Sequence, residues 1–540
     1  MSDAGAPIET EKKNQTLPDP NPPNLLPSSS DLKENIKAYP KIIGYVFAVA
    51  PGMILFGFDG VIVSTLVAVP VFKEHYGDLF GTEYIIPAMW LSLWTAASPI
   101  GIMIGAMVAG WIQEKLGRRL SLIIGAVVGI VGIGTCFGSN YAGALQVMRG
   151  IFLLGKLIEG ACTGMVACTT QTYASEIVPH VLHGAVFATF PAFILLGQLV
   201  AAGVLASQLQ METPRGYLTA IAVQWVFSLI VIALTMILPE SPTWLVRQNR
   251  MESALASEQR LQKATIDCTQ LINDIAATLE QEKLDTLHQR PATLFECFQG
   301  RNRWRTLIVI FGNILPQLFG LTLLGNASYF LQLLGLDAHR SISLLQVGIA
   351  IGLVANLIGI WTIGKFNSTM LMFSTLAASG ILFLGISIAG FWYGVVPLWW
   401  TAVSFVLIIF IAGLGVWPAS VLIASQASSL RLRGKTQAIG WLVQGLNTGV
   451  FSIVLPYIYN PDAGNARGKT AFLFVGLCFI SVLLTWLYVP EMKGRSAANI
   501  DALFERGVPA RKWGTYTVDG EAAAVEFQAK TSMSRESVVD

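Results

Sequence analysis

The feature that most constrains this chain is Ile43–Val71, an apolar run in which Asp59 is the only charged residue. Such a run is long enough to cross a bilayer as a helix, for which about 20 apolar residues suffice. A carboxylate near the middle of a spanning helix costs about 3 kcal/mol, so its presence needs a reason. We predict that Asp59 faces a partner or a water-filled path on an ion or proton route; the alternative is a structural hydrogen bond within a helix bundle.

Composition extends this interpretation to the whole chain. Of its 540 residues, 53% are hydrophobic and only 13% are charged, and the mean hydropathy is +0.59. These values are typical of a polytopic membrane protein and exclude a soluble globular one. The net charge of +2 gives no reason to expect a nucleic-acid partner. The six cysteines show no paired spacing, so we expect no disulfide framework, no metal site and no cofactor.

The apolar runs form two groups of six, separated by a polar segment. We predict a disordered cytosolic tail at 1–40, a first six-helix half at 41–239, a cytosolic loop of short amphipathic helices at 240–303, a second six-helix half at 304–490 and a cytosolic tail at 491–540. The predicted spans lie near Ile43–Val71, Tyr84–Ile112, Leu120–Phe137, Ala142–Tyr173, Gly184–Ala206, Tyr217–Leu238, Trp304–Leu334, Ile342–Ile363, Met370–Gly390, Val395–Ala424, Thr436–Tyr459 and Ala471–Val489.

Basic residues indicate the orientation of these spans. Lys115, Arg118, Arg119, Lys365 and the basic residues of 240–305 all fall on one set of alternating loops. Loops that carry such an excess of Lys and Arg stay on the cytosolic side. We therefore predict that both termini and the central loop are cytosolic, and we expect a monomer in the plasma membrane.

A charged motif stands between the second and third predicted spans, Gly110-Trp-Ile-Gln-Glu114-Lys-Leu-Gly117-Arg118-Arg119. An acid, a glycine turn and two arginines at a helix junction can pair across neighbouring helix ends and hold one conformation shut. A simple positive-inside anchor is the alternative. Related segments end or follow other spans: Tyr173-Ala-Ser-Glu176-Ile-Val-Pro179, His183-Gly184, Pro239-Glu240-Ser-Pro242-Thr243-Trp244, Arg431-Leu-Arg433-Gly434-Lys435 and Pro490-Glu491-Met-Lys493-Gly494-Arg495.

In this order and at these places, the segments resemble the signatures of the sugar-porter family of the major facilitator superfamily. The late segments Arg431–Thr436 and Leu503–Lys512 resemble those of fungal maltose and general α-glucoside permeases. The resemblance implies an all-α membrane protein with twelve transmembrane helices in two six-helix halves and a cytosolic helical linker. It implies a secondary transporter that works by alternating access, and not an enzyme. It also implies a cytosolic charge network that closes an inner gate, formed by Glu114, Arg118, Arg119, Glu176, Glu240, Arg431, Arg433 and Glu491.

The resemblance also implies a proton-coupling pair. In proton-coupled members an aspartate of the first helix faces a base early in the fourth, and the matching residues are Asp59 and Lys156, where lysine replaces the usual arginine. An acid and a base buried together lower each other's desolvation cost. Glu159 follows Lys156 by one helical turn and either joins this network or lies near the outer rim, where it merely solvates the span.

Amide side chains are the substrate-binding candidates, because an amide can donate to and accept from neighbouring sugar hydroxyls. They are Gln198, Gln317, Asn326, Gln444 and Asn447. Each of them has the alternative of tying two helices together. Phe319, Val421 and Ile102 stand where sugar-handling relatives place polar or amphipathic residues, which predicts a more apolar cavity. The alternative is that these three face neighbouring helices and that ordinary sugars bind through the amides.

The function that we expect is proton-coupled symport of a sugar or glycoside, with protons, a small-molecule substrate and the lipid bilayer as partners. Two alternatives stay open. One is a uniporter or exporter of a less polar fungal metabolite. The other is a non-transporting nutrient receptor, against which the short segment after Glu491 counts. No glycine-rich loop suited to cradling phosphate is present, which argues against ATP-driven pumping.

Overall fold

The computed structural model describes residues 32–81, 83–211, 213–263, 267–288, 295–428, 432–493, 495 and 497–515. Within them, twelve helices are long and apolar enough to cross a membrane. Residues 1–31 of the predicted disordered tail lie outside this description. The prediction of disorder is wrong for Leu32–Ala38, which form helix α1. This stretch lies beyond the prolines of the tail, and α1 packs against helices of the first half.

The first half contains six spanning helices in which the predicted runs are recognisable. They are α2 (Pro40–Leu66), α4 (Ala88–Leu116), α5 (Arg118–Gly138), α6 (Leu145–Ile177), α7 (His180–Gln208) and α8 (Arg215–Ile237). The first span is shorter than predicted because Pro70 begins a separate helix, α3 (Pro70–Tyr76). A short antiparallel hairpin of β1 (Asp78–Phe80) and β2 (Glu83–Ile85) follows α3. A 3₁₀ turn, η1 (Ser139–Tyr141), extends the end of α5.

The second half repeats this arrangement with two interrupted spans. Its helices are α12 (Asn302–Leu318), α13 (Leu321–Gly325), α14 (Ala327–Leu333), α15 (Ala338–Lys365), α16 (Ser368–Ala389), α17 (Val395–Leu414), α18 (Val416–Ala427), α19 (Arg433–Tyr459), the 3₁₀ turn η3 (Arg467–Thr470) and α20 (Ala471–Tyr488). The seventh span breaks at Gly320, whose φ of +91° suits glycine. A Cβ at this position would also lie 2.8 Å from Phe383 Cζ, so the break has no room for a side chain. The tenth span breaks at Gly415.

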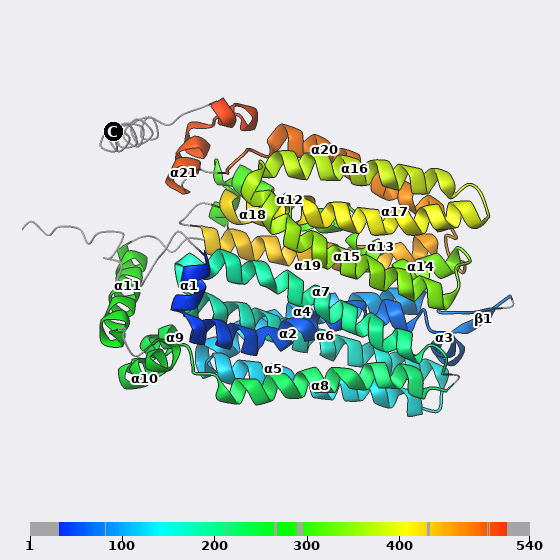
Figure 1. Ribbon diagram of the computed structural model, residues 1–540, viewed down its shortest axis with the longest axis horizontal. Helices are drawn as coiled ribbons and strands as arrows, with labels where there is room; N and C mark the ends of the chain where they lie inside the picture. Colours follow the sequence, from blue (N-terminus) through cyan, green and yellow to red (C-terminus); the bar gives the residue numbers. More distant parts are fainter. Residues whose placement is uncertain are drawn as a thin grey trace, which may run out of the picture.

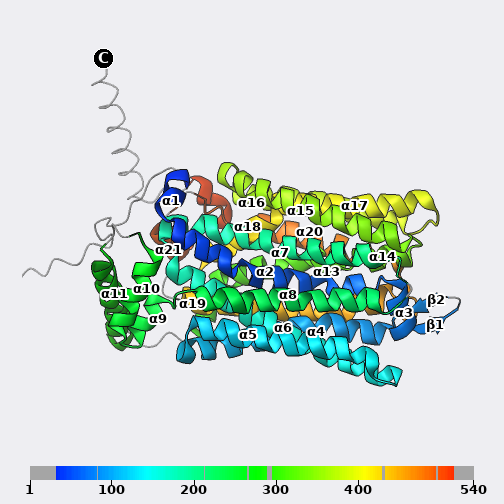
Figure 2. The same ribbon diagram turned by 60° about the horizontal axis from the view of Figure 1, so that its bottom comes forward.

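Two polar segments cover the same end of the helix bundle. The linker comprises α9 (Pro242–Arg247), α10 (Met251–Leu261), α11 (Cys268–His288) and η2 (Phe295–Phe298). The C-terminal segment comprises α21 (Ala497–Arg506) and η4 (Ala510–Thr515). Figures 1 and 2 show α9, α10, α11 and α21 at one end of the bundle and the β1–β2 hairpin at the other. We name these the linker end and the hairpin end.

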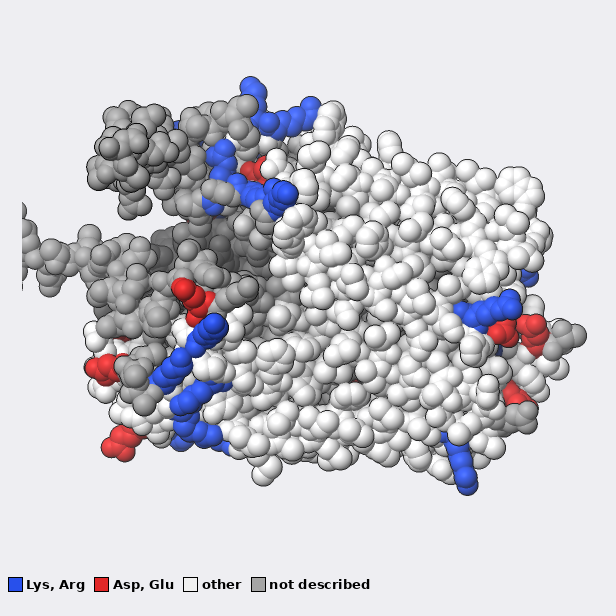
Figure 3. All heavy atoms as spheres, viewed as in Figure 1, with Lys and Arg blue, Asp and Glu red and all other residues white. Residues whose placement is uncertain are grey.

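The surface between the two ends is apolar. On the face shown in Figure 3, Lys, Arg, Asp and Glu gather at the two ends, and the band between them carries almost none. Large apolar side chains such as Met107, Trp111, Ile381 and Phe479 are more than half exposed. A continuous apolar surface of this extent is stable only against lipid. The chain is a multi-pass membrane protein.

Glycines bring two helix pairs of the first half into close contact. In α4 and α6, a Cβ on Gly105 would clash with the backbone of Ala161, and one on Gly164 would clash with that of Ile102. In α2 and α7, a Cβ on Gly57 would clash with the backbone of Ile194. Small residues allow such close backbone approach between membrane helices. The functional groups described next lie along the seam between these two pairs.

Candidate functional site

The structure places Asp59 and Lys156 in contact, as the sequence predicts. Asp59 of α2 is 3% exposed and Lys156 of α6 is 1% exposed. Lys156 Nζ donates to Asp59 Oδ1 in a buried ion pair. Ser98 of α4 donates its hydroxyl to the other carboxylate oxygen, Oδ2. Both oxygens of Asp59 are therefore satisfied, from two different helices.

Glu159 is the third charged member of this cluster. Lys156 Nζ also donates to Glu159 Oε2, at 2.6 Å. Glu159 is only 3% exposed, so of the two sequence-based interpretations it joins the network, and the alternative of a solvated rim does not hold. Glu159 is buried because it lies where α6 packs closely against α5. A Cβ on Gly132 of α5 would lie 3.1 Å from Glu159 Cγ. The second carboxylate oxygen of Glu159, Oε1, is buried and has no hydrogen-bond partner among the residues that the structure describes.

The cluster contains two acids for one base. Arg149, the other basic residue of α6, is not available to it, because its guanidinium bonds Asp78 at 2.8 Å and the Tyr76 carbonyl at 2.8 Å. Two ionised carboxylates and one ammonium would leave one uncompensated negative charge inside the bilayer. Such a charge is costly, and the usual remedy is the uptake of a proton. The arrangement is thus suited to binding and releasing a proton.

Sequence reasoning missed Ser98. Its hydroxyl is held at Asp59 because α4 and α6 approach closely, which positions both partners of Asp59 on one rigid helix pair. No sequence signal distinguishes this serine from the other hydroxyl residues of the same span. Among the described residues, no group of His, Cys, Asp and Glu side chains is arranged to hold a metal ion.

At the hairpin end, hydrogen bonds join the two halves. Lys73 Nζ of α3 donates to Gln332 Oε1 of α14 at 2.7 Å, and Gln332 Nε2 donates to the Ala68 carbonyl at 2.9 Å. Burial lowers the pKa of Lys73, and the nearby Glu83 opposes that shift. Further bonds join α4 with α19 and with the loop that follows it: Ser92 to the Ile453 carbonyl, Thr95 to the Ser452 carbonyl, and the Ala88 amide to Asp462. The halves are closed against each other at this end.

At the linker end, one ion pair between members of the predicted charge network is present, and it lies within the first half. Arg118 bonds Glu176 at 2.5 Å, and its guanidinium also donates to the Gln113 carbonyl at 3.0 Å. Glu240 pairs with neither guanidinium. Its carboxylate accepts the backbone N–H groups of Arg118 and Arg119, at 2.9 and 3.2 Å, and so caps the N-terminus of α5. Carboxylates are favourable at that end of a helix dipole. Gly117 has a φ of +88°, and a Cβ there would lie 2.6 Å from the Glu240 carboxylate.

The other predicted gate residues are engaged differently. Arg119 donates to the carbonyls of Thr235 and Met236 at the C-terminus of α8, at 3.3 and 2.9 Å. Glu114 has an exposed side chain, and its backbone carbonyl accepts from the Trp244 indole at 3.0 Å. Arg431 and the side chain of Arg433 lie outside the described part of the chain.

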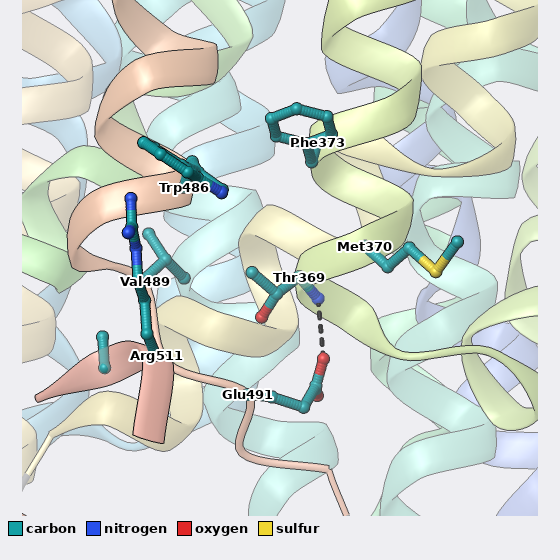
Figure 4. A pocket seen from close by; sticks show the side chains of 8 residues that line it. Thr369, Met370, Phe373, Trp486, Val489, Glu491 and Arg511 are labelled. Atoms are coloured by element: carbon teal, nitrogen blue, oxygen red, sulfur yellow. Dashed lines mark hydrogen bonds between the residues drawn. The ribbon is translucent and has the colours of Figure 1, made fainter. Parts of the chain in front are cut away.

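Glu491 occupies the equivalent position in the second half. Its carboxylate accepts the backbone N–H of Thr369, at 3.0 Å, in the first turn of α16 (Figure 4). It also accepts the N–H of Lys493, at 3.1 Å. Glu240 and Glu491 thus cap the third spanning helix of each half, although the arginine pair exists only in the first. In this conformation the described members join helices within a half.

The five candidate amides fall into two groups. Gln317, Asn326 and Asn447 are engaged within the second half. Gln317 Nε2 donates to Thr448 at 2.9 Å and its oxygen accepts from Thr322, Asn326 donates to the Thr322 carbonyl at 2.9 Å, and Asn447 donates to the Ile314 carbonyl at 3.3 Å. Gln198 and Gln444 are half-buried and their side chains bond no described residue. Two amides therefore remain available to a ligand.

The three apolar positions predicted to line the cavity differ in their burial. Phe319 is buried in the hydrophobic core beside the break of the seventh span. Ile102 is half-buried and its backbone packs against Gly164. Val421 is 60% exposed. In this conformation Phe319 packs in the core directly after the end of α12 at Leu318.

Comparison with known proteins identifies the family to which this chain belongs. The chain matches the family described as Sugar (and other) transporter over residues 45–504. The General alpha-glucoside permease of Saccharomyces cerevisiae is 27% identical, over 93% of this chain and 81% of that protein. The MFS transporter fmqE of Aspergillus fumigatus is 26% identical, over 84% of each chain.

Solved structures agree with the predicted fold class. The inward-open conformation of the xylose transporter XylE from E. coli has a TM-score of 0.67 at 20% identity, over 86% of this chain and 99% of that one. XylE bound to 6-bromo-6-deoxy-D-glucose gives 0.66 at 21% identity, with the same coverage. The predicted all-α architecture of twelve spanning helices and a helical linker is confirmed. The chain belongs to the sugar (and other) transporter family and has the fold of the major facilitator superfamily.

Proposed function

We propose that this transporter couples proton movement to symport of a sugar or glycoside by alternating access. The observation that carries the proposal is the buried cluster of Asp59, Lys156 and Glu159, where two acids share one base. A helix bundle gains no stability from an uncompensated charge inside the bilayer, whereas a proton site needs one. The cluster also joins α2 to α4 and α6, so a change in its charge alters the packing of these helices.

The proposed cycle uses the contacts at both ends. Proton and substrate enter while the hairpin end is open, and the bonds from Lys73 to Gln332 and from Ser92 and Thr95 to α19 form as this end closes. We place the linker end in the cytosol, because basic residues gather on its loops, and we place the protein in the plasma membrane. The charge network at the linker end then closes the inner gate in the opposite conformation.

A sugar or glycoside is the substrate class that we propose. The name of the General alpha-glucoside permease assigns such substrates to a relative that aligns with most of this chain. The amides of Gln198 and Gln444 supply donors and acceptors suited to hydroxyls.

One observation favours a less polar cargo as the second candidate. Three of the five candidate amides already hydrogen-bond within the protein, so fewer groups remain to meet sugar hydroxyls. Each hydroxyl left without a partner costs about 1–3 kcal/mol. A ligand with one hydroxylated end and one apolar end would suit two free amides. A uniporter or exporter of such a metabolite is therefore the alternative to sugar symport.

Transport by purified protein in liposomes tests the proposal. With a pH gradient imposed, the wild type should concentrate a glucoside, and Asp59→Asn should lose this accumulation while exchange of substrate persists. Asp337→Asn is the matched control, since Asp337 is an aspartate that caps the N-terminus of α15. Accumulation by Asp59→Asn would refute coupling through this cluster, and binding without any flux would indicate a receptor.

The substrate class is tested by thermal stabilisation of the purified protein. A ligand at about a hundred times its Kd stabilises the protein by roughly 2.7 kcal/mol. Glucose, maltose, sucrose and a set of amphiphilic glycosides are compared at equal concentration. Stabilisation by the simple sugars alone would rule out the less polar cargo, and stabilisation by the amphiphiles alone would rule out the simple sugars.

A further inference from the structure

We infer that Glu159 carries the coupling proton and that Asp59 remains ionised as the fixed counter-ion of Lys156. This inference rests on the proposed function and names the acid within the cluster that the proton binds. Sequence comparison within the family points to the aspartate of the first helix, whereas the hydrogen bonds of this chain separate the two acids.

The two acids differ in how their oxygens are satisfied. Asp59 accepts from Lys156 through Oδ1 and from Ser98 through Oδ2. Within the described part of the chain, Glu159 accepts from Lys156 through Oε2 at 2.6 Å, its buried Oε1 has no hydrogen-bond partner, and the nearby Cys136 thiol donates to the Phe152 carbonyl. Hydrogen bonds to the ionised form favour that form, and a buried carboxylate oxygen without a donor disfavours it. The ionised state is therefore supported at Asp59 and unsupported at Glu159.

Among the described residues, Lys156 is the only positive charge that faces Glu159. The groups that face it are Lys156 of its own helix, Asp59 of α2 and the thiol of Cys136 on α5. Cys162, on the next turn of α6, is within electrostatic range of both acids. A neutral thiol compensates no carboxylate. The single ammonium is thus shared between two acids, and the cluster as a whole is one proton short of neutral.

Protonation at Glu159 removes the excess negative charge with the smallest loss of hydrogen bonds. A proton delivered by hydronium breaks one O–H bond of that ion, which leaves as water, and forms one O–H bond at Oε1, so the charge of the cluster changes from minus one to zero. Lys156 then serves Asp59 alone, and Ser98 keeps its bond to Asp59. Protonation at Asp59 instead would weaken two bonds and leave Oε1 of an ionised Glu159 without a donor. Release of the proton on the other side of the membrane restores the shared ammonium.

Position supports the same assignment. Glu159 lies where α6 meets α5, and Asp59 lies where α2 meets α4 and α6. Lys156 stands between the two acids and donates to both. A proton that arrives at Glu159 therefore transfers the ammonium toward α2 and strengthens the contact between α2 and α6. This gives protonation a direct mechanical effect on the first helix.

Isotope-edited infrared spectroscopy tests which acid is protonated. The protein carries Glu258→Gln, because Glu258 is a second buried glutamate, whose pKa burial raises, and lies far along the chain in α10. A protonated carboxyl gives a carbonyl stretch, recorded as a pH difference spectrum above about pH 5, where exposed carboxyls with pKa values near 4 are ionised. We expect ¹³C-labelled glutamate to shift this band and ¹³C-labelled aspartate to leave it in place. A shift with labelled aspartate would overturn the inference.

A transport measurement separates this inference from the proposed function. Glu159→Gln should lose pH-driven accumulation, and Glu159→Asp, which keeps an acid at the site, should recover part of it. Glu258→Gln should accumulate substrate like the wild type. If Asp59→Asn loses accumulation but Glu159→Gln keeps it, the cluster couples transport and Glu159 is not the carrier. If both keep it, the proposed coupling itself fails.

Discussion

The close contact between α4 and α6 predicts a sharp difference between two glycines of the same helix. A Cβ on Gly105 would lie 2.7 Å from the carbonyl carbon of Ala161 and 2.8 Å from its Cα, whereas ordinary contacts begin at 3.4 Å. The Ala161 carbonyl oxygen would lie closer still, so the helices must separate by about 1 Å or more to accept Gly105→Ala. Overpacking of this kind costs about 1–3 kcal/mol. The same movement would pull Ser98 away from Asp59.

Gly110→Ala is the matched control, because a Cβ on Gly110 meets nothing within 4 Å. Alanine is a better helix former than glycine by about 1 kcal/mol, so this variant should be as stable as the wild type or more stable. The assay is thermal unfolding of both variants in the same detergent, followed by the loss of monodisperse protein. Gly105→Ala should unfold several degrees below Gly110→Ala, and equal midpoints would refute the close packing that holds the proton cluster.

Two further predictions concern the ends of the bundle. Closure of the hairpin end buries Lys73 and lowers its pKa, so the closed form binds the Lys73 proton less well than the open form. Raising the pH toward the ordinary lysine pKa of about 10.4 should therefore favour the closed form, which would reduce the labelling of a cysteine placed at that end. Lys73→Gln should remove this pH dependence. At the linker end, Arg118→Ala leaves the largely buried Glu176 without its partner and should lower the free energy of unfolding by about 3 kcal/mol. Arg119→Ala removes only bonds to helix-end carbonyls and should lower it by about 1 kcal/mol. Equal losses of thermal stability in the two variants would contradict these different roles.

Hydropathy was sufficient to predict the twelve spans in two groups of six, because bilayer thickness imposes a length and a composition on each span. The family resemblance of the charged motifs supplied the fold. Hydropathy did not predict where spans are interrupted. The seventh span continues in hydropathy through Phe319 and Gly320, yet the chain breaks there because the glycine takes a left-handed conformation. The break at Gly415 is likewise invisible in an uninterrupted apolar sequence.

The candidate site shows a similar limit. Asp59 and Lys156 were predictable as partners from the resemblance to proton-coupled members of the family, and the pairing agrees with the rule that a charge inside an apolar span requires compensation. The burial of Glu159 was not predictable, since its place depends on how deeply α6 sits and on the contact with Gly132 of α5. The roles of the amides depend on hydrogen bonds between distant segments, as between Gln317 and Thr448, which no local pattern encodes.

At the linker end, helix α10 and the C-terminal segment are each fastened to a different half. Helix α10 is held to the first half by Lys41, which donates to the Gln262 carbonyl at 2.8 Å, and by Arg260, which donates to the Ile237 carbonyl at 2.6 Å, whereas η2 of the linker packs against α12 of the second half. The C-terminal segment is held to the second half by Arg305, whose guanidinium bonds Asp501 and lies 4.6 Å from the centroid of the Phe504 ring. Two fluorophores, one on α10 and one on α21, would therefore each move with a different half. Energy transfer between them would report the relative motion of the two halves in real time without a label inside the membrane.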